Sequence, residues 1–223
     1  ALLERAAAGH AELHPFGWSP GGARTLREWI RWSIDTHLAT AVTDDEIDAI
    51  TTFLATIPVP VTEPPPRDSL TLRAARGAEL FDRIGCGGCH VETLSVEDPV
   101  LRLSGGRRID LRRLLSASGE PPFSVAARTD LRSHRMGPAL ADPPSVRLAS
   151  EADRFITPPL WGVASRGPFL HDGRAATLEE AILAHGGEAA PARDAWIALG
   201  GEQSDVRIYL STLTRIRTIT WTR

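Results

Sequence analysis

The sequence predicts an all-α fold with long irregular loops, in which a short helical segment precedes a larger domain. Apolar residues recur three and four positions apart in several stretches, which is the spacing of one face of a helix. Residues 43–46 and 177–180 each pair a threonine with a glutamate three positions later, the capping box that opens a helix. Prolines and glycines separate these stretches and mark where helices end.

The first part of the chain predicts two helices and a linker. Residues 26–38 place tryptophans and isoleucines among charged side chains, and residues 43–57 repeat isoleucine and leucine at helical spacing. Prolines at positions 58, 60 and 64–66 stop the second helix and form a stiff linker. We therefore expect a helical segment with its linker at residues 1–66 and a second domain at residues 67–223.

The second part predicts a helix near each end. Residues 70–85 form the first, and the apolar residues at 206–213 fall on one helical stripe. Residues 91–160 are rich in Pro, Gly, Ser and Arg with weak periodicity, which predicts long loops. Residues 215–223 alternate in polarity and predict an edge strand or an extended tail.

Composition narrows the class of protein. A net charge of −3 argues against a nucleic-acid-binding protein. No run of about 18 apolar residues is present, so no membrane span is expected. All 25 basic residues are arginine, so docking to a partner cannot use a ring of lysines. The chain opens without an initiator methionine or a signal peptide, and we expect a processed or truncated product.

The most specific motif is C-x-x-C-H at residues 86–90, which holds the only two cysteines of the chain. This spacing is typical of c-type haem attachment. The thiols of Cys86 and Cys89 add across the two vinyl groups of the porphyrin, and His90 supplies the proximal iron ligand. Gly87 and Gly88 lack a Cβ and let the backbone lie close to the ring. A zinc site would need further ligands, and a thioredoxin-type motif would need a βαβ unit.

We therefore expect one covalent haem c in a c-type cytochrome domain whose long loops wrap the haem. The haem would supply the buried core that such loops lack. Small c-type cytochromes cross their first and last helices, and here Gly77 or Phe81 would meet Tyr209. Because haem c is attached outside the cytoplasm, we expect a periplasmic or otherwise extracytoplasmic protein.

Two residues are the main candidates for the iron ligand on the side opposite His90. His185 ends an apolar stripe on the helix that begins at Thr177, and Gly186 follows it as a helix terminator. An imidazole on an apolar face needs a partner, which is either the iron or a hydrogen-bonded neighbour in the core. Met136 is the alternative, because it follows His90 by 46 residues in a loop beside Gly137.

The other histidines are weaker candidates. His171 precedes a tight Asp-Gly turn, which fits a structural or propionate-contacting role better than ligation of the iron. His10, His14 and His37 precede the linker, and surface or packing roles are expected for them.

Several motifs in order resemble a known family. They are GAELF at 77–81, the C-x-x-C-H motif, SHRMGPALAD at 133–142, TPPLWG at 157–162, FLHDGR at 169–174, TLEEAI at 177–182 and HGGEA at 185–189. Together they resemble the C-terminal haem domain of the di-haem oxidoreductases related to bacterial cytochrome c peroxidase and MauG. The resemblance spans about residues 70–214.

The resemblance implies roles for several residues. In the peroxidase branch, a methionine 14 residues after the HDG histidine binds the electron-transfer haem, and the same count from His171 gives His185. This implies a low-spin haem held by His90 and His185, with His171 and Arg174 among the cofactor-binding residues. Trp18 falls where the family carries a tryptophan between its two haems, which implies an electron relay.

Three departures weaken a peroxidase assignment. The N-terminal haem domain of the family, with its own C-x-x-C-H, is absent from this sequence. Trp29 stands where the family has a catalytic glutamine, and Ala39 stands near its acidic residue, although Asp35 is close.

We therefore expect an electron-transfer protein or subunit that exchanges electrons with another redox protein or haem subunit as part of a larger complex, with no catalytic residues of its own. The alternative is a portion of a di-haem peroxidase-like oxidoreductase whose reactive haem lies on a missing segment or a partner chain. The visible spectrum separates the two, because a high-spin ferric component would favour the enzyme.

Overall fold

The computed structural model describes residues 2–20, 22–38, 40–57, 61–63, 65, 67–114, 122–148 and 150–214. The helices are α1 (Leu2–Ala6), α2 (Leu26–His37), α3 (Asp44–Ala55), α4 (Thr71–Arg83), α5 (Leu178–Leu183), α6 (Ala190–Ala198) and α7 (Gln203–Ser211). The strands are β1 (Val61–Thr62), β2 (Leu94–Val96), β3 (Val100–Arg102), β4 (Arg108–Asp110), β5 (Phe123–Val125), β6 (Ser133–Arg135), β7 (Arg154–Ile156) and β8 (Leu213–Thr214).

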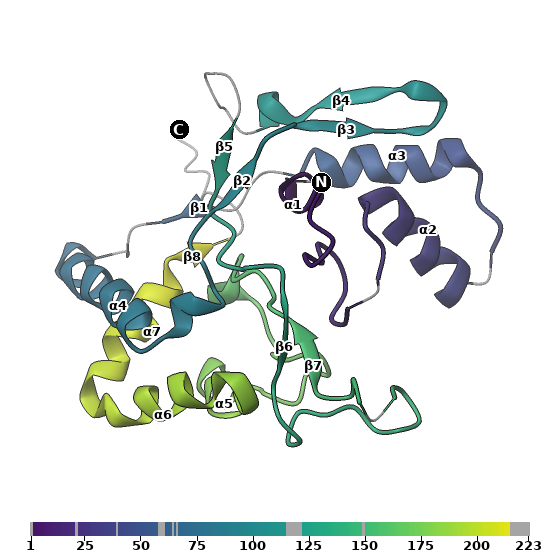
Figure 1. Ribbon diagram of the computed structural model, residues 1–223. Coiled ribbons are helices and arrows are strands. Elements are labelled where there is room, and N and C mark those ends of the chain that lie inside the picture. The colour runs from purple at the N-terminus through teal and green to yellow at the C-terminus, as the bar shows by residue number, and fades with distance from the viewer. Residues whose placement is uncertain are drawn as a thin grey trace.

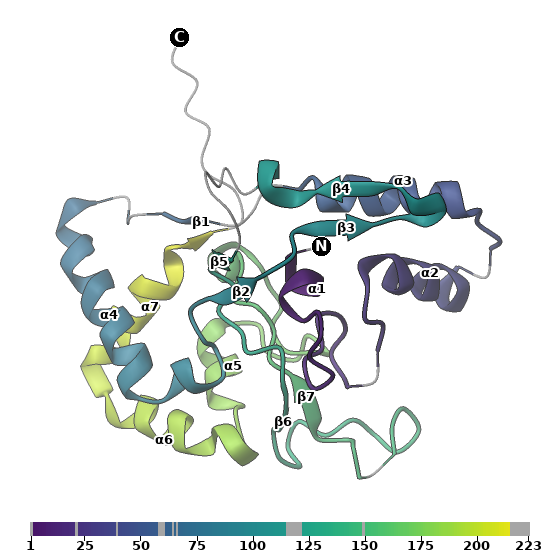
Figure 2. The same cartoon turned by 45° about the horizontal axis from the view of Figure 1, so that its top comes forward.

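Helices α4 and α7 lie side by side and cross at a glycine (Figures 1 and 2). A Cβ on Gly77 would overlap the backbone oxygen of Asp205 and lie 2.9 Å from the Cβ of Tyr209. Phe81 packs on the Tyr209 ring with centroids 5.5 Å apart. These contacts confirm the predicted meeting of Gly77 and Phe81 with Tyr209. Glycine is needed at position 77 because any side chain there would prevent the close approach of the two helices.

A buried apolar cluster surrounds this crossing and joins both ends of the second part of the chain. Its members are Leu80, Phe81, Ile84, Leu160, Val163, Trp196, Val206, Tyr209, Leu210 and Leu213. The helices α5 and α6 complete this side of the molecule below α4 and α7 in Figure 1. The C-x-x-C-H motif follows α4 directly, so the cluster positions it.

The all-α expectation is wrong in one respect, because residues 91–160 contain paired strands. Strands β2–β5, β3–β4 and β6–β7 form antiparallel pairs, and β1 pairs with β8. Each strand has two or three residues, which is shorter than the four to eight residues over which alternation can be recognised.

These pairs also bury an apolar cluster of their own, so haem is not the sole source of a core for this region as was expected. Its members are Leu2, Ala55, Val96, Leu101, Leu111, Val125 and Ala127. The cluster therefore combines residues from both sides of the proline-rich linker.

Helices α2 and α3 pack against each other on the opposite side of the molecule from α4 and α7 (Figures 1 and 2). Capping boxes at Thr25 and Thr43 open them, as was predicted for Thr43. Leu26, Ile30 and Ile47 form their buried contact.

Two predictions fall partly or wholly outside the described residues. Residues 58–60, 64 and 66 of the proline-rich linker are outside them, and so is the predicted strand or tail at 215–223. The division of the chain after residue 66 stays a prediction. None of the helices in the described part of the chain has the length and hydropathy needed to span a membrane.

Candidate haem-binding site

The C-x-x-C-H motif begins on a 3₁₀ turn, Cys86–Gly88, that starts just after the end of α4 at Arg83. Gly85 turns the chain out of α4 with a φ of 93°, a left-handed conformation that favours glycine. Both cysteines are free thiols. Burial raises the pKa of the Cys86 thiol to about 11, so this thiol is protonated at neutral pH. The turn therefore presents two thiols and an imidazole within five residues.

His90 is held by a backbone hydrogen bond. Its Nδ1 lies 3.0 Å from the carbonyl oxygen of Arg128. Because a carbonyl can only accept, Nδ1 carries the proton and Nε2 keeps its lone pair. Burial lowers the pKa of His90 to about 4, so the ring is neutral at neutral pH. A neutral imidazole fixed in this way is the form that binds iron.

His185 is held in the same manner at the end of α5. Thr177 opens this helix with the predicted capping box. The Nδ1–H of His185 donates to the carbonyl oxygen of Ala181 at 2.7 Å, which leaves Nε2 free. Burial lowers the pKa of His185 as well, so this imidazole is also neutral.

His90 and His185 line one cavity of about 470 Å³. This volume lies within the range of about 300–1,000 Å³ that is typical of ligand and cofactor pockets. The predicted stripe on α5 contributes to its wall, and so do residues of α4, β7, α6 and α7. The apolar lining residues from these elements are Phe81, Phe155, Ile156, Leu178, Ala181, Ile182, Ala192, Trp196, Val206 and Leu210. Arg166 and Arg193 add positive charge to the lining.

A buried donor in the wall tests whether these residues fit a haem. Trp196 is 1% exposed, and its indole Nε1–H has no hydrogen-bond partner within the described residues. Leaving a buried donor unpaired costs about 1–3 kcal/mol. The partner of this N–H is therefore not among the described protein atoms. Two thiols, two neutral imidazoles and apolar walls together fit a c-type haem.

Met136 also lines this cavity, so the structure brings together the three residues predicted as iron ligands. Its backbone N–H donates to the carbonyl oxygen of Asp153 at 2.8 Å. Its own carbonyl oxygen would lie 2.8 Å from a Cβ placed on Gly186, the residue after His185. The loops that carry Met136 and His185 are therefore in contact, and the choice of His185 over Met136 stays a prediction.

Trp18 and His171 also line the cavity, whereas Arg174 is not among the residues that line it, and the roles that the resemblance implied for Trp18 and His171 stay predictions. The backbone oxygen of Trp18 accepts from the N–H of Ile156 at 2.9 Å, which ties the loop of Trp18 to β7. Arg174 donates to the carboxylate of Asp172 and to the carbonyl oxygen of Ala139. A cofactor-binding role for Arg174 stays a prediction.

His171 belongs to a compact polar network in the cavity wall. Its Nε2 lies 2.9 Å from a carboxylate oxygen of Asp142, and its ring stacks on Phe155 at 4.1 Å between centroids. Arg147 covers the Phe155 ring at 5.3 Å and contacts the same Asp142 at 3.5 Å. This closed arrangement fixes the orientation of His171 at the cavity wall, where the sequence indicated a structural or propionate-contacting role.

His134 forms a charged rim beside the cavity. Its Nε2 lies 2.7 Å from Asp130 and its Nδ1 lies 2.9 Å from Glu188, so each ring nitrogen can donate to a carboxylate. The bond to Asp130, followed by contact with Cys89, raises the pKa of His134 to about 11, and the ring is an imidazolium at neutral pH.

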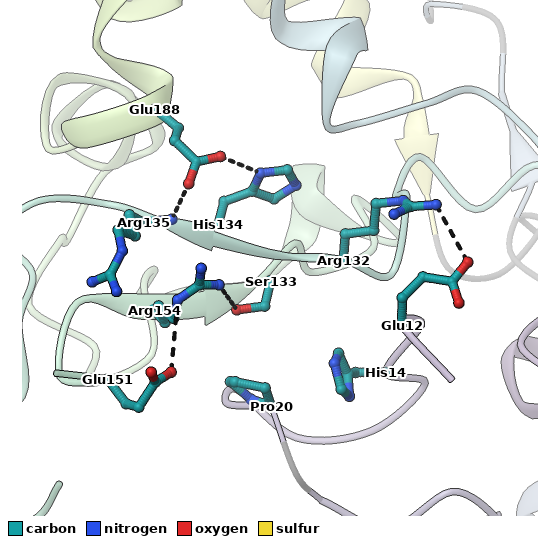
Figure 3. A pocket seen from close by; sticks show the side chains of 10 residues that line it. All are labelled: Glu12, His14, Pro20, Arg132, Ser133, His134, Arg135, Glu151, Arg154 and Glu188. Carbon is teal, nitrogen blue, oxygen red and sulfur yellow. Dashed lines mark hydrogen bonds and ion pairs between the residues drawn. The ribbon is translucent and has the colours of Figure 1, made fainter. Parts of the chain in front are cut away.

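Figure 3 shows His134 and Glu188 in a second cavity of about 600 Å³, which charged side chains of β6 and of the N-terminal segment also line. Arg132 faces Glu12 there at 3.5 Å, and Arg154 faces Glu151 at 3.6 Å. Three arginines, three glutamates and the His134 imidazolium line this cavity, so charges of both signs are mixed there.

Sequence reasoning missed several residues of the site. The carbonyl of Arg128, the unpaired donor of Trp196 and the ion pairs of His134 arise only when distant segments meet. Trp196 lies on α6, whose sequence carries no motif, and His134 appeared only within the motif at residues 133–142. Ligand atoms of Cys89, Asp130 and His134 lie within 4.8 Å of one another, but haem attachment would convert the Cys89 thiol to a thioether.

Comparison with known proteins identifies a haem-binding family. Residues 22–213 match a family model described as "Di-haem oxidoreductase, putative peroxidase". The match covers most of the chain, so the protein belongs to the di-haem oxidoreductase family, whose members are haem-containing oxidoreductases. A search of the curated proteins found no match.

Proposed function

We propose that this chain is an electron-transfer component of a di-haem oxidoreductase. It would hold one haem c through Cys86 and Cys89 and clamp the iron between His90 and His185. The observation that carries the proposal is the pairing of these imidazoles in one cavity, each neutral and each with Nδ1 bound to a backbone carbonyl. When bound, the haem supplies a one-electron couple, and the protein tunes it through ligands and surroundings.

The remaining residues of the site support that role. Two backbone carbonyls hold both imidazoles in one neutral tautomer. Neither ring therefore has to gain or lose a proton when an electron arrives. The apolar walls exclude water, and Trp196 offers a hydrogen bond to a propionate. Trp18 lines the cavity and also reaches the surface, with 46% of its area exposed, and we propose that it relays electrons.

The number of haem-attachment motifs bears on the partner, and covalent haem attachment bears on the compartment. The family name specifies two haems, whereas this sequence has one C-x-x-C-H motif. We propose that the partner is another redox protein or haem subunit, and that the protein works in the periplasm or another extracytoplasmic compartment, where haem c is attached.

A second function is favoured by the family description, which names a peroxidase. In that case the chain would be a portion of a peroxidase-like oxidoreductase, and the reactive haem would lie elsewhere. An enzyme of this kind would require an iron with an open or weakly held position and acid–base groups beside it.

Two measurements on the purified protein test the proposal. The intact mass and a pyridine haemochrome assay give the number of haems for each chain, and we expect one. The visible spectrum should show sharp low-spin bands in the reduced form, with no change on adding peroxide or carbon monoxide. A chain without haem would contradict the proposal, and a high-spin ferric component that responds to peroxide would support the enzyme instead.

A further inference from the structure

The indole rings of Trp29 and Trp32 stack on each other along α2. Their ring centroids are 5.0 Å apart with an interplanar angle of 29°. Phe16 extends the stack on the other side of Trp29, at 6.3 Å and 17°. Residues three apart lie on the same side of a helix, so α2 itself sets the tryptophan pair. The result is an aromatic row of Phe16, Trp29 and Trp32.

The inner end of this row adjoins the haem-binding cavity. Gly17 links Phe16 to Trp18, and Trp18 lines the cavity. A Cβ on Gly17 would lie 3.3 Å from a ring carbon of Trp29, so the backbone beside Trp18 passes close to the Trp29 ring. Gly17 has a φ of +87°, which favours glycine at this contact. The cavity is therefore linked to Trp29 through Trp18 and the neighbouring backbone of Gly17.

The outer end of the row is at the protein surface. Trp32 is 48% exposed, and its ring also meets that of His37 edge-on at 5.4 Å. The helix does not need these rings for its core contact, because it buries Leu26 and Ile30 against Ile47. Packing of α2 therefore leaves two stacked tryptophans unexplained, one in contact with the loop of Trp18 and one facing solvent.

We propose that Trp29 and Trp32 carry electrons between the haem pocket, by way of Trp18, and a redox partner at the surface. This proposal rests on the proposed function and adds the route and its exit. One electron moves between the haem iron, ferrous before and ferric after, and a one-electron acceptor such as a haem protein. No bond forms or breaks, and no proton is transferred. Stacked aromatic rings favour this transfer because their delocalised orbitals bridge the gap between donor and acceptor.

The test measures electron transfer along the row in the haem-loaded protein. A Thr36→Cys variant supplies one free thiol a turn beyond Trp32, because Cys86 and Cys89 are occupied by haem. A ruthenium photosensitiser is attached there, and a laser flash starts reduction of the ferric haem, which is followed by its absorbance. A second labelled protein, Leu72→Cys, places the same sensitiser on α4, away from the row, where Leu72 is 83% exposed.

We expect Trp29→Leu and Trp32→Leu each to slow reduction from the label at position 36 by several-fold. Trp29→Phe should restore part of the rate, because it keeps an aromatic ring. None of these changes should alter the rate from position 72. Phe53→Leu is the matched control, since it removes another exposed aromatic side chain, 68% exposed, from the neighbouring helix α3.

An unchanged rate from position 36 in both leucine variants would overturn the route. Haem spectra and potentials recorded before the flash show that each variant is folded and loaded. They also separate the two proposals: a missing haem or a high-spin haem contradicts the proposed function, whereas a normal haem with unchanged kinetics contradicts only the route.

Discussion

His90 and His185 line the same cavity, and each donates its Nδ1–H to a backbone carbonyl, of Arg128 at 3.0 Å and of Ala181 at 2.7 Å. The two bonds select the same tautomer in both rings. Burial keeps both imidazoles neutral. Neither ring must change protonation or tautomer to bind a metal, so the site is organised before the iron arrives.

Replacing His185 tests the ligand on the far side of the iron. His185→Ala removes the second imidazole, and the ferric haem should become high-spin, because one axial position then holds water or nothing. Absorption and electron paramagnetic resonance spectra measure this change. Added imidazole should restore the low-spin spectrum by entering the space that the side chain leaves.

Met136→Leu is the matched control, because Met136 lines the same cavity. It should leave the low-spin spectrum unchanged. The assignment to His185 fails if the oxidised protein shows a methionine–iron band near the red end of the spectrum and Met136→Leu abolishes it.

Trp196→Phe tests the unpaired donor in the cavity wall. The substitution keeps most of the buried ring and removes the Nε1–H that we propose donates to a haem propionate, so the haem-loaded protein should lose about 1–2 kcal/mol of unfolding free energy. The reduction potential should shift as well, because a donor to a propionate changes the charge felt by the iron. Denaturant titration and potentiometry measure both effects.

Trp161→Phe provides the comparison for Trp196. The Nε1–H of Trp161 donates to the carbonyl oxygen of Ala126 at 2.7 Å, and Trp161 is not among the residues that line the cavity. It should cost stability without moving the potential. An unaltered potential in Trp196→Phe would show that this indole makes no bond to the haem.

Gly77→Ala should disrupt the crossing of α4 and α7. The added Cβ would overlap the backbone oxygen of Asp205, and a backbone atom cannot move aside as a flexible side chain does. We expect a loss of about 3 kcal/mol or more, at the upper end of overpacking substitutions. Thermal unfolding of the haem-loaded protein measures it. Gly201→Ala, where a Cβ would have open space, should change stability little, and equal effects at the two positions would contradict the steric argument.

The sequence predicted the parts of this site that depend on short motifs. Residues 86–90 specified thiols and imidazole by spacing alone. The capping box at Thr177 was confirmed, but α5 ends at Leu183, so His185 lies just beyond the helix rather than in its last turn, and it still lines the cavity. The residues of the helix crossing could also be predicted, because close helix contact requires a glycine on one helix and an aromatic side chain to fill the space on the other.

Other parts of the fold and site depend on distant segments and could not be predicted. Strands β2–β7 have three residues each, too few to establish alternation, and their pairing joins positions such as Leu94 and Val125 that no local signal connects. The carbonyl that orients His90 belongs to Arg128, 38 residues further along the chain. Every residue has a backbone oxygen, so the sequence does not indicate which one accepts the bond from His90.

Asp48 links α3 to the β3–β4 hairpin, and its titration should appear in the acid stability of the protein. Its side chain is 2% exposed and accepts hydrogen bonds from Arg27 at 2.7 Å, from the N–H of Ser104 at 2.9 Å and from Arg107 at 2.8 Å. Burial alone would raise the pKa of Asp48, but the bonds from Ser104 and Arg27 outweigh it and lower the pKa from 3.8 to about 2.

Because the folded pKa lies below the unfolded value, the charged carboxylate stabilises the fold above pH 3.8, and this stabilisation is lost as the pH falls toward 2. The shift corresponds to a contribution on the order of 2 kcal/mol. Asp48→Asn should therefore lower stability at neutral pH by about 1–3 kcal/mol and should flatten the decline in acid. Asp45→Asn is the control, because Asp45 contacts the same Arg107 at 2.8 Å but its side chain is 87% exposed. Chemical denaturation at several pH values measures the unfolding free energy of both variants. If stability falls in acid equally in Asp48→Asn and in the unaltered protein, the pKa of Asp48 is not lowered by folding.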